Sequence, residues 1–208
     1  MAAKAEANSG APDRAPRMFA SRLLPFAVAG ALSIVALAIA AKTGVGADGQ
    51  AMLAARYTAR VSFAVFLVVY LASSLWRLRR NELTRTILRR RRQWGLAFAL
   101  SHTIHLAALA WFTIGFQHAP RMTTLLGGGL GYALMFAMVL TSNDASQRMM
   151  GIWWKRLHTA GIHWLWFIFA FSYLGRILGP PDMRLQGMIL FPVALAAIGL
   201  RLVAARRS

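Results

Sequence analysis

Six long apolar runs dominate this chain and constrain its fold more than any other feature. They lie at roughly 20–41, 58–76, 94–117, 124–141, 153–174 and 185–204. Because an α-helix rises about 1.5 Å per residue, about 20 apolar residues suffice to cross the hydrocarbon core of a bilayer. The sequence therefore predicts an all-α integral membrane protein, built as a bundle of six transmembrane helices.

The composition supports a membrane location and excludes several kinds of site. Hydrophobic residues make up 58% of the 208 residues and charged residues only 14%, well below the charged share of a typical soluble domain. The chain has no cysteine, which excludes a disulfide scaffold, a thiolate zinc site and an iron–sulfur cluster. The longest connection, 77–93, is too short to hold a flavin or nicotinamide domain.

The N-terminal segment differs from the rest of the chain. Residues 1–18 are rich in Ala, Pro and charge without apolar periodicity, which predicts a disordered cytoplasmic tail ahead of a membrane domain at 19–208. Arg22 and the apolar run that follows it also resemble a signal peptide, but the run is longer than a usual one. We therefore expect a first transmembrane helix that is retained.

Basic residues predict the orientation of the bundle. Lys and Arg number 24, against 6 Asp and Glu. In a six-span arrangement 18 of the basic residues fall on one side of the membrane and 6 on the other. The positive-inside rule then places both termini and the loop at 77–93 in the cytoplasm.

The loop at 77–93 is the densest charge run and has two interpretations. It ends in Arg89, Arg90, Arg91 and Arg92. These arginines can lie on anionic lipid as a topology signal, each contributing about 1 kcal/mol near the surface, or can dock an acidic soluble partner. Nucleic-acid binding is not expected, because no aromatic stacking groups alternate with the arginines.

Two further patterns concern packing. Thr141-Ser142-Asn143-Asp144 followed by Gln147 resembles a helix N-cap with a capping-box partner. Asp144 can pair with an Arg of the 77–93 loop, which would tie together the cytoplasmic ends of the third and fifth helices. Gly127 and Gly131 form a GxxxG pattern that permits close contact between helices.

Histidines are the candidate functional residues. Four of the five lie within predicted spans, two on the third and two on the fifth: His102, His105, His158 and His163. Titratable groups in a span usually face the bundle interior and mark a functional site. Two helices that supply imidazoles to one interior can hold a haem iron on both axial faces. The structural alternative is that these side chains only make hydrogen bonds between helices.

Helical geometry narrows the possible pairs. His102 and His105 are three residues apart and share a helical face. His158 and His163 are five apart and point about 140° away from each other, so both cannot face one haem. Depth counted from the flanking tryptophans favours His158 with His102, whereas His158 with His105 requires helix tilt or a slanted haem.

Two stretches of the sequence resemble one known family. They are RRRQWGLAFALSHTIHLAALAWF and LTSNDASQRMMGIWWKRLHTAGIHWLWFIFAFSYLGR. Both are similar to the ferric-reductase-like transmembrane domain. That family includes the haem-binding membrane subunit of the bacterial periplasmic methionine sulfoxide reductase system, and the membrane domains of ferric reductases and NADPH oxidases. The resemblance covers about residues 56–204.

The resemblance implies a six-helix bundle that carries b-type haem between the third and fifth helices and passes electrons across the membrane. By position it implies His105 and His158 as axial ligands of the haem iron. His102 is the alternative to His105, and His163 is a further candidate. The family's second histidine on the fifth helix is Phe171 here, and the position fourteen before His105 is Arg91. Because of both departures, we expect one haem b rather than a two-haem relay.

The resemblance also implies partners and a location. Because the chain has no flavin or nicotinamide domain, it would act as a subunit of a two-component oxidoreductase in a bacterial inner membrane. Its electron donor would be a quinol or a separate flavin reductase, and the acceptors that the resemblance implies range from a periplasmic protein to ferric iron or oxygen. The alternative is a haem-free structural or assembly protein with a degenerate haem site. A proton-coupled transporter is not expected, because the predicted spans contain no Asp or Glu.

Overall fold

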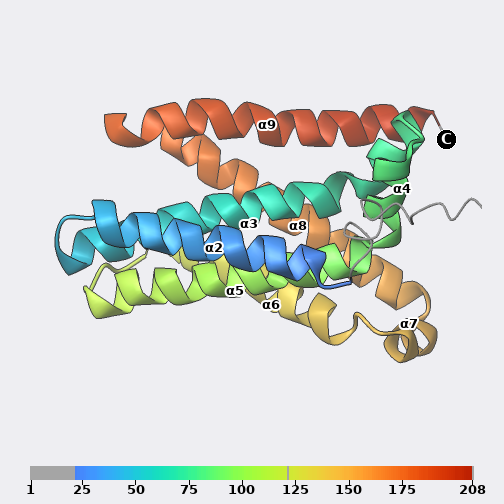
Figure 1. Cartoon of the computed structure of the whole chain (residues 1–208), viewed down its shortest axis with the longest axis horizontal. Coiled ribbons are helices and arrows are strands. Elements are labelled where there is room, and N and C mark those ends of the chain that lie inside the picture. Colours follow the sequence, from blue (N-terminus) through green and yellow to red (C-terminus); the bar gives the residue numbers. More distant parts are fainter. Residues whose placement is uncertain (1–21, 121, 208) are drawn as a thin grey trace, which may run out of the picture.

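The structure, a computed structural model, describes residues 22–120 and 122–207, which fold into helices joined by short connections (Figure 1). The predicted tail at 1–18 lies outside the described residues. The part that is described contains no β-strand. Its six long helices are α2 (Leu24–Thr43), α3 (Gly46–Leu78), α5 (Arg91–Gly115), α6 (Met122–Leu140), α8 (Ile152–Ile177) and α9 (Pro181–Arg206). Two short helices, α4 (Glu82–Arg89) and α7 (Asp144–Met150), lie in the connections.

Five of the long helices are long and apolar enough to cross a membrane: α2, α3, α5, α6 and α9. This confirms a multi-pass helical membrane protein. The sixth long helix, α8, has 26 residues but is not among the five. Its tryptophans, histidines and first-turn cations lower its mean hydropathy, although its length is sufficient to span a bilayer.

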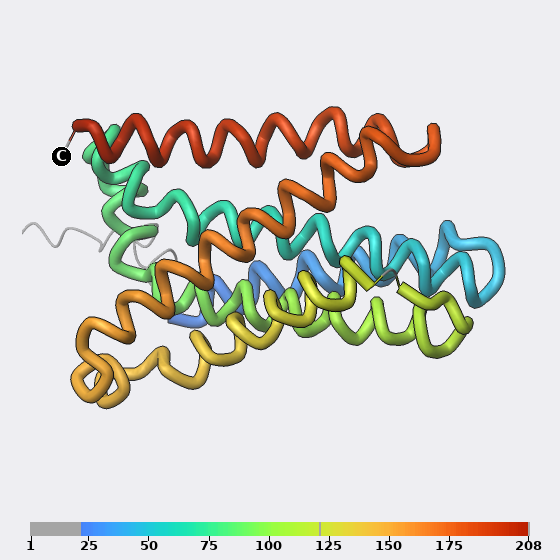
Figure 2. Tube along the Cα trace, turned by 180° about the vertical axis from the view of Figure 1, so that it is seen from behind, coloured from blue at the N-terminus to red at the C-terminus, as the bar shows by residue number. Residues whose placement is uncertain are grey.

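The long helices run back and forth between two ends of the bundle (Figures 1 and 2). One end, called the α4/α7 end, holds α4, α7 and the last residues of α9. The other, called the α8–α9 end, holds the connections from α2 to α3, from α5 to α6 and from α8 to α9. Figure 2 shows that α8 crosses the bundle obliquely, from α7 at one end to the start of α9 at the other. This tilt affects which side chains of α8 can meet those of α5.

Aromatic rings from three helices fill the centre of the bundle. Phe169 of α8 lies with its ring centroid 5.1 Å from that of Phe63 and 5.3 Å from that of Phe66, both on α3. Phe98 of α5 lies 5.3 Å from Phe66. Offset and edge-to-face pairs of this kind stabilise a core beyond their buried area. The rings fix α5 and α8, which carry the candidate histidines, against α3. α3 carries Thr58, whose hydroxyl contacts one of these histidines.

Small residues and polar caps join the helices where the sequence predicted. A Cβ built on Gly131 would lie 3.7 Å from Leu165, and Trp164 Nε1 donates to the Gly127 carbonyl at 3.2 Å, so the GxxxG pattern does face a neighbouring helix, α8. Asn143 caps α7 by accepting from the Ser146 amide at 2.7 Å. The predicted capping-box partner is wrong, because Gln147 falls one position after the third residue of the helix.

The expected ion pair between Asp144 and an arginine of the 77–93 segment is confirmed. Arg92 Nη1 lies 2.9 Å from Asp144 Oδ1, so the first turn of α5 is joined to the first turn of α7. Both side chains are largely exposed, and an exposed pair of this kind contributes at most about 1 kcal/mol to stability. Its effect is therefore to position these two ends relative to each other.

Candidate functional site

His102 lies in the interior of the bundle, surrounded by aromatic rings. It is 9% exposed, and its ring stacks at 4.7 Å on Tyr132 of α6 and at 5.2 Å on Phe98. Phe169 approaches from α8 at 5.5 Å. The His102 Nδ1 atom is buried and has no hydrogen-bond partner among the residues that the structure describes. A buried imidazole nitrogen without a partner is costly in a protein interior, and it is available as a metal ligand.

His105 lies one turn further along α5, with its ring centroid 5.3 Å from that of His102. Its Nδ1 is 3.3 Å from the hydroxyl oxygen of Thr58 on α3. Because the Thr58 hydroxyl donates to the Ala54 carbonyl at 2.7 Å, its oxygen accepts from His105 Nδ1–H. This bond favours the tautomer in which Nε2 keeps its lone pair, as in most metal-binding histidines.

His158 occupies a different part of the bundle, near the α4/α7 end. Its ring stacks on Trp154 at 4.1 Å, and its Nε2 lies 3.1 Å from the Thr141 hydroxyl at the end of α6. Thr141 donates its own proton to the Ala137 carbonyl at 2.7 Å. His158 Nε2–H is therefore the donor to Thr141, which leaves Nδ1 with the lone pair.

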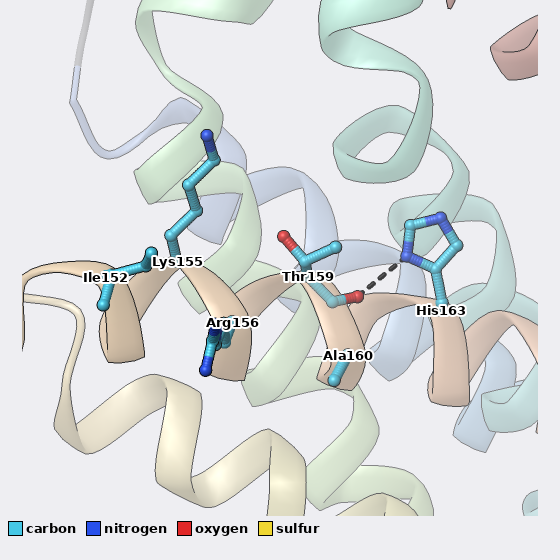
Figure 3. Close-up of a pocket in the computed structure, with 6 residues that line it drawn as sticks. All are labelled: Ile152, Lys155, Arg156, Thr159, Ala160 and His163. Atoms are coloured by element: carbon cyan, nitrogen blue, oxygen red, sulfur yellow. Dashed lines mark hydrogen bonds between the residues drawn. The ribbon is translucent and has the colours of Figure 1, made fainter.

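His163 makes contacts separate from those of His102 and His105. Its Nδ1–H donates to the Thr159 carbonyl at 2.8 Å, and its ring meets Tyr70 of α3 edge-on at 5.8 Å. His163 lines an open pocket of about 640 Å³ along α8. Lys155 and Arg156 line the same pocket (Figure 3). Within α8, His163 and His158 thus have separate surroundings, as their five-residue spacing predicts.

The structure brings His102 and His105 together but does not bring His158 beside them. Residue spacings on two helices, α6 and α8, give independent estimates of the distance between His102 and His158 along the bundle. On α6, Tyr132 contacts His102 and Thr141 contacts His158, and their nine-residue spacing corresponds to about 14 Å along the axis. On α8, His158 precedes Phe169, which contacts His102, by eleven residues, or about 16 Å.

The similar depth expected for His102 and His158 is therefore wrong. It was counted from Trp94 and Trp153 as though both lay at one level. In the structure His158 has Arg91 as its charged neighbour, and Arg91 precedes Trp94 in α5. The physical cause is α7, which carries the chain beyond the end of α5 before α8 begins, together with the oblique path of α8 (Figure 2).

Two hydroxyl groups belong to the candidate site that the sequence analysis did not identify. Thr58 of α3 orients His105, and Thr141, directly after α6, orients His158. A signal for Thr58 was present, since a threonine in a transmembrane helix often bonds either the preceding turn or a polar group on the next helix. The sequence could not indicate which histidine each of them meets.

The donor set fits a haem iron. His102 is buried and His105 beside it is partly buried, uncharged imidazole is an accepted ligand of haem iron, and His102 Nδ1 lacks a partner in the described part of the chain. No group of three or more His, Cys, Asp or Glu that could hold a bare metal ion occurs within the described ranges. One or two imidazoles would suit a metal that is already bound in a macrocycle such as haem, because the macrocycle provides the other ligands.

Fold and site together define a class: a multi-pass helical membrane protein with imidazole side chains in its interior. Comparison with known proteins identifies its relatives. Over 160 residues the chain is 28% identical to the protein-methionine-sulfoxide reductase heme-binding subunit MsrQ of Salmonella paratyphi B and to that of Salmonella newport. The match covers 70% of this chain and 73% of each relative. No protein-family model and no solved structure matches the chain. The relatives confirm the family resemblance inferred from the sequence.

Proposed function

We propose that this chain is a haem-binding subunit that transfers electrons across a bacterial inner membrane as part of a two-component oxidoreductase. The observation that carries the proposal is the adjacent imidazole pair of α5, in which His102 is buried and its Nδ1 is left without a partner among the described residues. The haem-binding name of the relatives supports it. When bound, haem b would supply reversible one-electron chemistry, and the protein would supply ligands and surroundings.

The proposed axial ligands are His105 and His158, with His102 as the alternative to His105 and His163 as a further candidate. Thr58 and Thr141 hold the rings of His105 and His158 and set their tautomers. The separation of about 14 to 16 Å along α6 and α8 also supports a second arrangement. In that arrangement His105 or His102 serves one haem, and His158, beside Arg91, serves another.

A spectrum of the detergent-purified protein tests the proposal first. We expect a red preparation whose absorption bands sharpen when dithionite is added, as low-spin b-type haem requires, with haem quantified per chain. One haem per chain would support the shared site, and two would support separate sites. A colourless preparation that also fails to take up added haem would favour the alternative, a structural protein whose histidines only bond Thr58 and Thr141.

We further propose that α8 is the sixth span and that the α4/α7 end faces the cytoplasm. The arginine run from Arg89 to Arg92 would then contact anionic lipid or a soluble reductase. Electrons would come from a quinol or from that flavin reductase and leave to an acceptor beyond the α8–α9 end. Basic residues concentrate on the proposed cytoplasmic side, as the positive-inside rule requires.

Because the chain contains no cysteine, single cysteines can map its orientation without background. Arg148→Cys in α7 and Arg184→Cys in α9 replace exposed residues at the two ends of α8. In intact cells we expect an impermeant maleimide to label position 184 only, and to label position 148 after the cells are broken. Labelling of both positions from the same side would show that α8 does not cross the membrane.

A further inference from the structure

Polar side chains of three helices meet near the α8–α9 end, and two of these helices, α3 and α8, contribute arginines. Arg60 Nη2 on α3 donates to Gln186 Oε1 on α9 at 2.8 Å. On α8, the Arg176 guanidinium lies 5.3 Å from the centroid of the Tyr173 ring. Arg176 lies close enough to Arg60, Arg56 and Tyr173 for their charges to interact. In the sequence these arginines were counted only among the six basic residues of the less basic side of the membrane.

Four donor groups in this cluster are buried and lack a hydrogen-bond partner. They are Arg60 Nε, Arg176 Nη1, the Tyr173 hydroxyl and Gln186 Nε2, and no acceptor in the described ranges reaches them. Tyr173 is only 1% exposed. Leaving a buried donor unpaired is costly, and native proteins rarely leave several together. Because all four groups can donate a hydrogen bond, the missing partner would be a hydrogen-bond acceptor.

The charge balance also requires an anion. Asp182 is the carboxylate paired with this cluster; its Oδ2 lies 3.5 Å from Arg56 Nη1, and its side chain is 61% exposed. The guanidinium groups of Arg60 and Arg176 have no such carboxylate among the described residues. A cation that is taken out of water without a counter-ion is strongly disfavoured. An oxygen anion between the two groups would satisfy both charge and hydrogen bonding, since guanidinium binds carboxylate and phosphate with paired N–H groups.

The depth of the cluster indicates where such an anion would come from. Arg60 lies sixteen residues, about 24 Å, along α3 from Trp76 at the opposite end, within the roughly 30 Å of a bilayer core. This places Arg60 just inside the far boundary, where lipid headgroups begin. His105 is also within electrostatic range of Arg176, so an acidic substituent of a ligand held on α5 would come from the other direction.

We propose that Arg60, Arg176 and Tyr173 form a binding site for an oxyanion, a carboxylate or phosphate group carried by a membrane-embedded ligand. Gln186 holds Arg60 in place from α9. Two sources have this chemistry: the phosphate of an anionic lipid, and the propionate carboxylates of a porphyrin. The phosphate source is independent of the proposed function, whereas the carboxylate source depends on it.

The test measures two kinds of binding on the full-length protein in detergent. Thermal unfolding is followed while dioleoylphosphatidylglycerol is titrated in, with dioleoylglycerol, which lacks the phosphate, as the matched lipid. Retention of added haem is compared with retention of haem dimethyl ester, in which both carboxylates are blocked. The variants are Arg60→Gln and Tyr173→Phe, and the control is Arg184→Gln, which makes the same charge change on an exposed side chain at the same end.

We expect the protein to prefer the probe that carries an oxyanion in at least one of the two pairs. Tyr173→Phe should weaken that binding about tenfold, the effect of one hydrogen bond to a charged group, and Arg60→Gln by more, while Arg184→Gln leaves it unchanged. A preference in the lipid pair assigns the phosphate source, even if no haem is taken up and the proposed function fails. A preference in the haem pair assigns the carboxylates.

The proposal is overturned if neither pair shows a preference, or if Arg184→Gln weakens binding as much as Arg60→Gln. If Arg60→Gln does not fold, Tyr173→Phe still decides, because it removes one hydroxyl and keeps the ring in its packed position against Phe63. Unchanged binding in Tyr173→Phe would then also overturn the site as described.

Discussion

Replacement of His105 by glycine is expected to release the haem that we propose binds on α5. The imidazole bound to Thr58 would be lost, and with it the axial bond that retains the cofactor in detergent. His158→Gly is expected to release the haem held near Thr141 in the same way. If one haem uses both ligands, each variant should lose all of it. If each histidine serves its own haem, each variant should keep about half, and only the double variant should be colourless. Haem per chain is the measurement.

Imidazole added to the buffer separates loss of a ligand from loss of the fold. The space left by the missing ring can accept free imidazole, so haem binding should return in His105→Gly and His158→Gly. His118→Gly is the matched control, because that ring lies at the surface and pairs with Asp48 at 3.0 Å. Unchanged haem content in both the His105 and His158 variants would contradict the ligand assignment. If only His102→Gly lost haem, His102 would be the ligand instead.

The boundaries of the helices show what apolar patterning could and could not predict. All six runs became long helices, because each is long enough to satisfy its own backbone inside a bilayer. α3, however, begins at Gly46 rather than at 58. Its first twelve residues include Asp48, Gln50 and Arg56, which interrupt the apolar run, although helix formation depends on the backbone and not on hydropathy. The loop expected at 77–93 also contains a helix, capped by Asn81 and Thr84.

The candidate site could be predicted within a helix but not between helices. His102 and His105 share one face, as their spacing requires, and the structure confirms that their rings adjoin. The level of His158 could not be predicted, because residue counting assumes parallel axes and equal starting points. A tilted α8 and an intervening α7 violate both assumptions. The cluster around Arg60 was missed for a related reason: Arg60 and Arg176 are 116 positions apart in sequence, and only the packing of the helices brings them together.

The second large effect is expected at Gly187, where α9 crosses α8 most closely. A Cβ added there would lie 2.8 Å from the Tyr173 carbonyl oxygen and 2.8 Å from the Ile177 amide nitrogen. Both atoms belong to the backbone of α8 and cannot turn aside as a side chain would. Gly187→Ala should therefore push the two helices apart and lower the free energy of unfolding by about 1 to 3 kcal/mol, the usual cost of overpacking. Unfolding in a detergent titration measures it.

Gly199→Ala, on the same helix, is the matched control, because we expect it to change the free energy of unfolding in the opposite direction. Nothing lies within 4 Å of a Cβ built at Gly199, so the helix-forming preference of alanine should raise stability there by up to about 1 kcal/mol. If Gly187→Ala lowers the free energy of unfolding and Gly199→Ala raises it, then contact with α8, and not the backbone preference of glycine, determines the effect at Gly187. Equal effects would contradict the close crossing. Because Tyr173 and Gln186 flank this crossing, the Gly187 variant should also weaken oxyanion binding, whereas the Gly199 variant should leave it intact.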